Sequence, residues 1–345
     1  MIEVKNLVKR FGAKYAVDDI SFTIGEGEVV GFLGPNGAGK STTMNIITGY
    51  MSSTSGTVEI GNSDILDDPI GAKKRIGYLP EQPPLYVDMT VREYLNFVYD
   101  LKGCKLNRKK HLEEICRVVK ILDDYNKNRL IKNLSKGYKQ RVGIAQALVG
   151  NPGIIILDEP TVGLDPKEII EIRSLIRALG ENHTVILSTH ILTEVQAVCD
   201  RILIINSGKL IADEKTENII NMLEGSRRLN ARICGAQRDV LRELRAIPEI
   251  TRAEVIGERE GDSFLYSIES SAGVDIRKSL FYMLAKNNLP LIGLAEQNTS
   301  LEDIFISLVD KKQTSNKKSG DVPKFDIKPS ANEPQKEEKS NAGNI

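Results

Sequence analysis

A glycine-rich stretch between two apolar runs constrains this 345-residue sequence more than any other feature. Residues 34–41 read GPNGAGKS; the apolar run EVVGFL (28–33) precedes them and TTMNIITG follows. The pattern G-x-x-x-x-G-K-[ST] between a strand and a helix is typical of a phosphate-binding loop. Backbone N–H groups of such a loop, with the N-terminus of the following helix, surround phosphate oxygens. The sequence therefore predicts an α/β chain with a nucleotide site at this loop.

The residues of this loop indicate separate tasks in binding a nucleotide. The glycines allow the backbone to turn with its N–H groups inward, and Lys40 is expected to neutralise the β and γ phosphates. The hydroxyl of Ser41 is expected to bind Mg²⁺, which prefers a few protein oxygens. We expect the nucleotide to contact the whole stretch, namely Gly34, Pro35, Asn36, Gly37, Ala38, Gly39, Lys40, Ser41 and Thr42.

Two further apolar runs end in residues suited to hydrolysis. IIILDEP (154–160) ends in Asp158, expected to hold Mg²⁺, and Glu159, expected to polarise the attacking water. The run that ends in STH places His190 after a parallel strand, at the same sheet edge. His190 is expected there to contact the γ-phosphate and align Glu159, so the sequence predicts ATP hydrolysis.

The remaining pattern predicts a mainly parallel sheet with an antiparallel portion. Continuous apolar runs at 28–33, 154–158, 184–188 and 201–205 indicate strands that are buried on both faces. The more alternating runs IEVKNL, VDDISFTI and TVEIG indicate the antiparallel portion. Helix starts are predicted at Thr90, by a capping box with Glu93, and at Asp165, by an N-cap followed by proline.

A second unit is predicted over 228–310 and a tail over 311–345. The second unit has the order β-α-β-β-α-β with a final helix over 300–309, a small α+β ferredoxin-like arrangement. The tail is rich in Lys, Ser, Asn, Pro and Glu. It has too little apolar surface to offset the entropy of ordering, so we expect it to be disordered.

The stretch LSKGYKQR (134–141) is a second helix start suited to an anion, in a chain that already has one. Ser135 is a good N-cap, Gly137 permits close approach to the backbone, and the following helix supplies a positive dipole end. The local alternative is a plain N-cap of an amphipathic helix.

These segments, in this order, resemble an ABC-type ATPase, the nucleotide-binding subunit of ATP-driven transporters. The matching pieces are GPNGAGKST (34–42), LPEQPPLY with Gln82, LSKGYKQR, IIILDEP, GLDP (163–166) and STH with His190. The resemblance covers residues 1 to about 224. It implies a P-loop ATPase domain over 1–224, with a helical subdomain at about 84–150 that receives the membrane partner.

The resemblance also assigns residues that the local pattern leaves open. It implies that Phe11 stacks on adenine, with Tyr15 as a competitor, and that Gln82 binds Mg²⁺. It implies that two chains dimerise head to tail, so that Ser135 and Gly137 of one chain cap the γ-phosphate bound by the other. The sequence departs from the family pattern at Lys136, Tyr138 and Val162, none of which is a predicted catalytic group.

The resemblance implies ATP and Mg²⁺ as cofactors, a polytopic membrane permease and a second ATPase subunit as partners, and a cytoplasmic place on the inner face of the membrane. The unit at 228–310 resembles the C-terminal extension of bacterial exporter-type subunits.

One alternative is a soluble ABC ATPase acting on the ribosome or on nucleic acid. The equal numbers of basic and acidic residues, 47 each, give no reason to expect nucleic acid. Another is a regulatory ATPase whose C-terminal unit senses a ligand.

Overall fold

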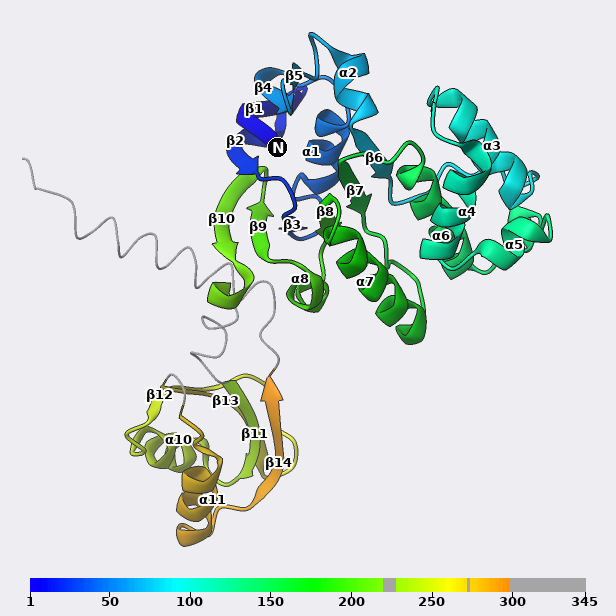
Figure 1. Cartoon of the computed structure of the whole chain (residues 1–345). Coiled ribbons are helices and arrows are strands. Elements are labelled where there is room, and N and C mark those ends of the chain that lie inside the picture. Colours follow the sequence, from blue (N-terminus) through cyan, green and yellow to red (C-terminus); the bar gives the residue numbers. More distant parts are fainter. Residues whose placement is uncertain (220–227, 272–273, 298–345) are drawn as a thin grey trace, which may run out of the picture.

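The computed structural model describes residues 1–219, 228–271 and 274–297 (Figure 1). The N-terminal strands form an antiparallel sheet of order β2-β1-β4-β5. This sheet is the predicted antiparallel portion, and the apolar side chains of its inner face pack against the larger sheet described next. Its strands are β1 Ile2–Phe11, β2 Lys14–Ile24, β4 Ser55–Ile60 and β5 Ser63–Asp64.

The larger sheet has the order β10-β9-β3-β8-β7-β6. Its strands pair in parallel from β9 to β6, and β10 is antiparallel at one edge. Every residue of β3, β7 and β8 is buried, which confirms the prediction of strands covered on both faces. The strands are β3 Val29–Leu33, β6 Ile76–Leu79, β7 Ile154–Asp158, β8 Thr184–Thr189, β9 Arg201–Asn206 and β10 Lys209–Lys215.

Helices connect these strands, and the predicted caps are present. Thr90 and Glu93 form the capping box of α3, and the Asp165 side chain accepts a hydrogen bond from the backbone N–H of Glu168 at the start of α7. The helices are α1 Lys40–Ile47, α2 Pro69–Lys74, α3 Val91–Leu101, α4 Arg108–Val118, α5 Leu122–Asn126, η1 Ile131–Asn133, α6 Lys136–Leu148, α7 Pro166–Gly180 and α8 Leu192–Val198.

Helix α6 is held at its middle and at its C-terminal end. The guanidinium of Arg141, only 4% exposed, donates to the Val119 carbonyl at 3.1 Å and to Glu171 on α7 at 2.5 Å. The ammonium of Lys102 donates to three carbonyls at the end of α6, on Gln146, Ala147 and Val149. A cation at this end opposes the negative end of the helix dipole. The orientation of α6, and so of its N-terminus, is therefore fixed by the contacts of Arg141 and Lys102.

Residues 228–297 form a separate antiparallel sheet of order β12-β13-β11-β14, with two helices (Figure 1). This unit has its own hydrophobic core, which includes the fully buried side chains of Tyr266 and Ile268. This is the predicted β-α-β-β-α-β order; the expected final helix over 300–309 and the tail from 311 lie outside the described residues. The elements are β11 Arg228–Cys234, α10 Gln237–Arg245, β12 Ile250–Val255, β13 Ser263–Ser270, α11 Arg277–Lys286 and β14 Leu291–Gln297.

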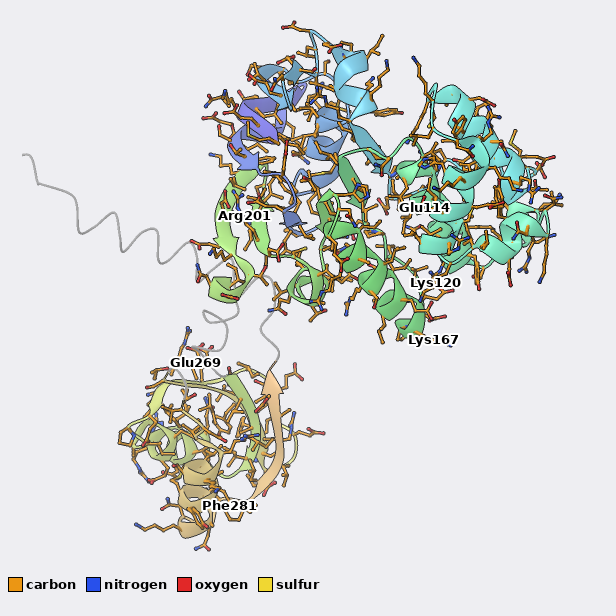
Figure 2. All side chains as sticks on the ribbon, in the orientation of Figure 1. Glu114, Lys120, Lys167, Arg201, Glu269 and Phe281 are labelled. Carbon is orange, nitrogen blue, oxygen red and sulfur yellow. The ribbon has the colours of Figure 1, made fainter. Side chains whose placement is uncertain are left out.

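Ion pairs close the outer edge of the larger sheet. Arg201, labelled in Figure 2, lies at the start of β9 and donates two hydrogen bonds of 2.6 Å to Asp213 on β10. It also donates to Glu28 at 3.2 Å. Among the helices of the described ranges, we find none with the length and apolar composition needed to cross a membrane.

Candidate nucleotide site

A cavity of about 470 Å³ lies at the P-loop and brings most of the predicted residues together. The glycine-rich loop supplies its floor, and Glu159 and His190 come from the segments after β7 and β8. A cavity at the carboxyl ends of parallel strands is the usual ligand position in α/β sheets. It is lined by Phe11, Lys14, Ala16, Asn36, Gly37, Gly39, Lys40, Ser41, Thr42, Glu81, Glu159, Val162 and His190.

The glycine-rich loop has backbone geometry that larger residues would not tolerate. Gly39 is the N-cap of α1 and has φ of 110°, and a Cβ atom there would lie 2.4 Å from the Ala16 carbonyl oxygen. Gly34 has a similarly close neighbour, since a Cβ would lie 2.3 Å from the Ile205 oxygen. The loop therefore depends on glycine both for conformation and for close packing against β2 and β9.

Lys40 is a buried cation with three oxygen neighbours. Its side chain is 6% exposed, and Nζ donates to the carbonyls of Gly34 at 2.8 Å and Pro35 at 3.2 Å. The Glu159 carboxylate lies 3.5 Å from the same nitrogen. A lysine held this way, at the start of α1, is available to pair with phosphate oxygens in the cavity.

Glu159 and His190 are in direct contact, as the sequence analysis expected. Nδ1 of His190 lies 3.0 Å from both carboxylate oxygens of Glu159. The backbone of Glu159 is left-handed, with φ of 48°, and its N–H donates to the Ser188 carbonyl at 2.8 Å. A left-handed glutamate is strained, and such strain is common at functional sites. The arrangement suits an acid–base pair that acts on a water molecule.

Asp158 has the environment expected of a cation ligand. Burial raises the pKa of its carboxyl above the ordinary value, and the neighbouring hydroxyls of Ser188 and Ser41 offset part of that rise. One carboxylate oxygen, Oδ1, has no hydrogen-bond partner within the described residues. A buried acceptor without a donor, beside the Ser41 hydroxyl, fits a hard cation such as Mg²⁺.

The structure bears on two assignments that come from the resemblance: the choice between Phe11 and Tyr15 for the adenine, and Gln82 as a Mg²⁺ ligand. Phe11 is 52% exposed and lines the cavity, whereas Tyr15 does not line it and lies under the guanidinium of Arg10. Glu81 lines the cavity in place of its exposed neighbour Gln82, whose role as a Mg²⁺ ligand stays a prediction. Glu81 could have been suggested only by its position next to Gln82.

Ser135 and Gly137 do not line this cavity; they lie at the N-terminus of α6, where the carboxylate of Glu168 is close to both. Ser135 is the N-cap of α6, with Oγ accepting from the Tyr138 N–H at 3.3 Å. Glu168 on α7 lies 3.4 Å from the same oxygen, and a Cβ on Gly137 would lie 2.2 Å from its carboxyl carbon. The helix start thus faces a carboxylate, and the local sequence pattern does not predict this contact.

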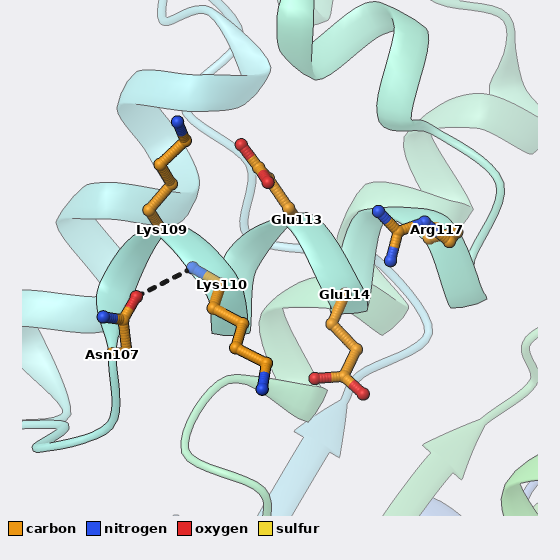
Figure 3. Close-up of a pocket in the computed structure, with 6 residues that line it drawn as sticks. All are labelled: Asn107, Lys109, Lys110, Glu113, Glu114 and Arg117. Atoms are coloured by element: carbon orange, nitrogen blue, oxygen red, sulfur yellow. Dashed lines mark hydrogen bonds between the residues drawn. The ribbon is translucent and has the colours of Figure 1, made fainter.

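A second hollow runs along α4 and has a different character (Figure 3). It is lined by Asn107, Lys109, Lys110, Glu113, Glu114 and Arg117, with the Asn107 side chain capping the helix at Lys110. Basic and acidic side chains follow each other here at helical spacing, as on a solvated helix face. Nothing in this hollow resembles the loop, the buried cation and the acid–base pair of the nucleotide cavity.

Comparison with known proteins gives the family. Residues 17–162 match the family model described as ABC transporter. The bacitracin transport ATP-binding protein BcrA of Bacillus licheniformis is 30% identical over 90% of this chain and 97% of its own length. The linearmycin resistance ATP-binding protein LnrL of Bacillus subtilis is 33% identical, over 89% of this chain and 98% of its own length.

A solved structure with the same fold supports the match. A dimeric ATP-binding cassette in a post-hydrolysis state, bound to ADP and phosphate, superposes with a TM-score of 0.57. It is 32% identical and covers 63% of this chain and 99% of its own. The chain therefore belongs to the ATP-binding subunits of ABC transporters, ATPases that dimerise and work with a membrane permease.

The position of Phe11 generates the first prediction. We expect Phe11→Ala to weaken ATP binding about tenfold, because an aromatic face stacked on a base contributes roughly 1–3 kcal/mol. Tyr15→Ala is the matched control, since Tyr15 is similarly exposed but does not line the cavity. The affinity of this variant for ATP should stay unchanged. Equilibrium binding of ATP to the full chain measures both. The opposite pattern would place the adenine on Tyr15.

Proposed function

We propose that two copies of this chain bind two ATP molecules head to tail and power export through a separate membrane permease. One observation carries the proposal: the buried cation and the acid–base pair line one cavity, whereas the phosphate-suited N-terminus of α6 lies outside it. A second copy, turned around, brings its own α6 N-terminus to that cavity. Each chain then supplies half of each site.

In this proposal the residues of the cavity act on ATP in order. Lys40 and the loop N–H groups bind the β and γ phosphates, and Phe11 stacks on the adenine. Glu159 accepts a proton from the attacking water, and His190, 3.0 Å away, holds the carboxylate in place. Ser41 and Asp158 are the residues that would hold Mg²⁺, with Gln82 as a further expected ligand. Bound Mg²⁺ supplies positive charge to the phosphate oxygens.

Hydrolysis then reopens the dimer, and the permease switches between two arrangements. The free energy of ATP thus becomes a shift in the populations of those arrangements. Ser135 and Gly137 are the groups through which one chain senses the γ-phosphate of the other. Glu168, whose carboxylate lies beside both residues here, has to turn aside for that contact.

The direction of transport and the place of the chain rest on its relatives. Two proteins that this chain matches over most of their length are named for bacitracin transport and linearmycin resistance. Export of an antibiotic or similar compound fits both names. The chain would then sit on the cytoplasmic side of the membrane, attached through the permease. Nothing in the site or the relatives favours action on the ribosome or on nucleic acid.

The dimer predicts a trapped state. We expect Glu159→Gln to bind ATP, to lose turnover by roughly 100-fold or more, and to accumulate as a dimer. The physical reason is that ATP holds the two halves together and only hydrolysis releases them. Light scattering after size exclusion in Mg-ATP measures the mass, and Glu159→Gln with Lys40→Ala is the control that should stay monomeric. A monomer in both would contradict the head-to-tail site.

The division of each site between two chains predicts complementation. Lys40→Ala removes the phosphate cation, and Gly137→Asp sets a carboxylate against the partner's γ-phosphate, so each variant alone should be inactive. A mixed dimer contains one site with an intact loop from one chain and an intact α6 from the other. Mixing the two variants should therefore restore part of the ATP hydrolysis. If mixing restores none, each chain carries its site alone.

The proposal that the chain works with a permease predicts that the two purify together in a fixed ratio. We expect the tagged protein, purified in gentle detergent from its own cells, to bring with it a chain with several long apolar helices. Mass spectrometry of the purified complex identifies that chain, and a parallel purification without the tag is the control. Recovery of ribosomes or nucleic acid instead would favour the alternative of a soluble ATPase.

A further inference from the structure

A buried carboxylate beside the site joins the two segments that carry the acid–base pair. Glu194 on α8 is 1% exposed. Its Oε1 accepts a hydrogen bond of 2.5 Å from the Thr161 hydroxyl, and its Oε2 accepts one of 2.8 Å from the Thr189 hydroxyl. Both threonines are also buried. Each carboxylate oxygen thus has its own hydroxyl donor, which offsets the large cost of burying the charge.

The two threonines lie next to the proposed catalytic residues in the chain. Thr161 lies two residues after Glu159, and Thr189 lies directly before His190. The Thr189 oxygen also accepts from the Ile191 N–H at 3.1 Å, so it fixes the backbone on both sides of His190. A single carboxylate therefore holds the segments from which the two halves of the pair project.

The backbone of Glu159 shows why such a support is needed. Its left-handed conformation, with φ of 48°, is unfavourable for a residue with a side chain. Such a conformation persists only where the surrounding structure fixes it. The N–H of Glu159 is bonded to Ser188 on one side, and Thr161 is bonded to Glu194 on the other. The strained residue is thus held from both directions.

We infer that Glu194 is a positioning residue for hydrolysis. It acts through Thr161 and Thr189 to hold the side chains of Glu159 and His190 in contact with each other. It does not line the nucleotide cavity. Arg173 on α7, with a nitrogen 4.0 Å from the Glu194 carboxylate, supplies a cation nearby. The inference rests on the proposed roles of Glu159 and His190. A carboxylate that only stabilises the core is the alternative.

The experiment removes each hydroxyl without changing the shape of the side chain. Thr161→Val and Thr189→Val leave one oxygen of Glu194 without its donor, whereas Thr161→Ser and Thr189→Ser keep the donor. Thr184→Val is the matched control. Thr184 is 3% exposed and lies on the same strand as Thr189 but at its other end, where its hydroxyl accepts from the Gly27 N–H at 2.9 Å.

We expect kcat for ATP hydrolysis by the full chain to fall roughly 10- to 100-fold in both valine variants, because small displacements of catalytic groups have effects of that size. KM for ATP should stay within about twofold, and both serine variants should keep most of the activity. Thr184→Val should lower the melting temperature as the other valine variants do, but leave kcat unchanged.

Two results separate the inference from the function on which it rests. If Thr161→Val and Thr189→Val melt lower but hydrolyse ATP normally, while Glu159→Gln is inactive, Glu194 serves stability alone and the inference is wrong. If Glu159→Gln itself retains turnover, the proposed role of Glu159 fails first. Loss of activity in the serine variants as well would also count against a hydroxyl-specific contact.

Discussion

The parallel pairing of β7, β8 and β3 is the constraint on which the site depends. In this register Asp158 lies opposite Ser188, and Leu33 lies opposite Thr189. Because all three strands end at the same edge, the phosphate-binding loop (34–42), the carboxylates of Asp158 and Glu159, and His190 lie side by side, although they are far apart in the sequence. The strands are buried on both faces, so a shift of register would disturb two hydrophobic cores at once.

Much of this arrangement could be predicted from the sequence, for reasons that are local. Continuous apolar runs identify buried strands, and Gly39 and Lys40 follow one of them in a motif whose backbone geometry is almost fixed. The caps at Thr90 and Asp165 are likewise contained within four residues of sequence. Once the strands are placed, their shared edge brings Glu159 and His190 together without further information.

What could not be predicted depends on contacts between distant segments or on irregular strands. β1 and β2 pair with register shifts near Arg10, so a simple alternation does not say whether Phe11 or Tyr15 faces the cavity. The Glu168 contact with Ser135 joins two helices, and in the sequence this residue is only an acid in a first turn. The exact position of each site residue therefore depends on packing between segments that are far apart in the sequence. The roles of Phe11 and Gln82 come from the family resemblance and stay predictions.

The left-handed backbone of Glu159 has a consequence for protein engineering. Glycine adopts this conformation without strain, whereas a glutamate here lowers the stability of the folded chain by roughly 1–2 kcal/mol. A screen that selects only for thermal stability would therefore favour glycine at this position and would return well-folded chains that lack the carboxylate we propose as the general base. Engineering that raises the thermal stability of this subunit therefore has to select for ATP turnover at the same time.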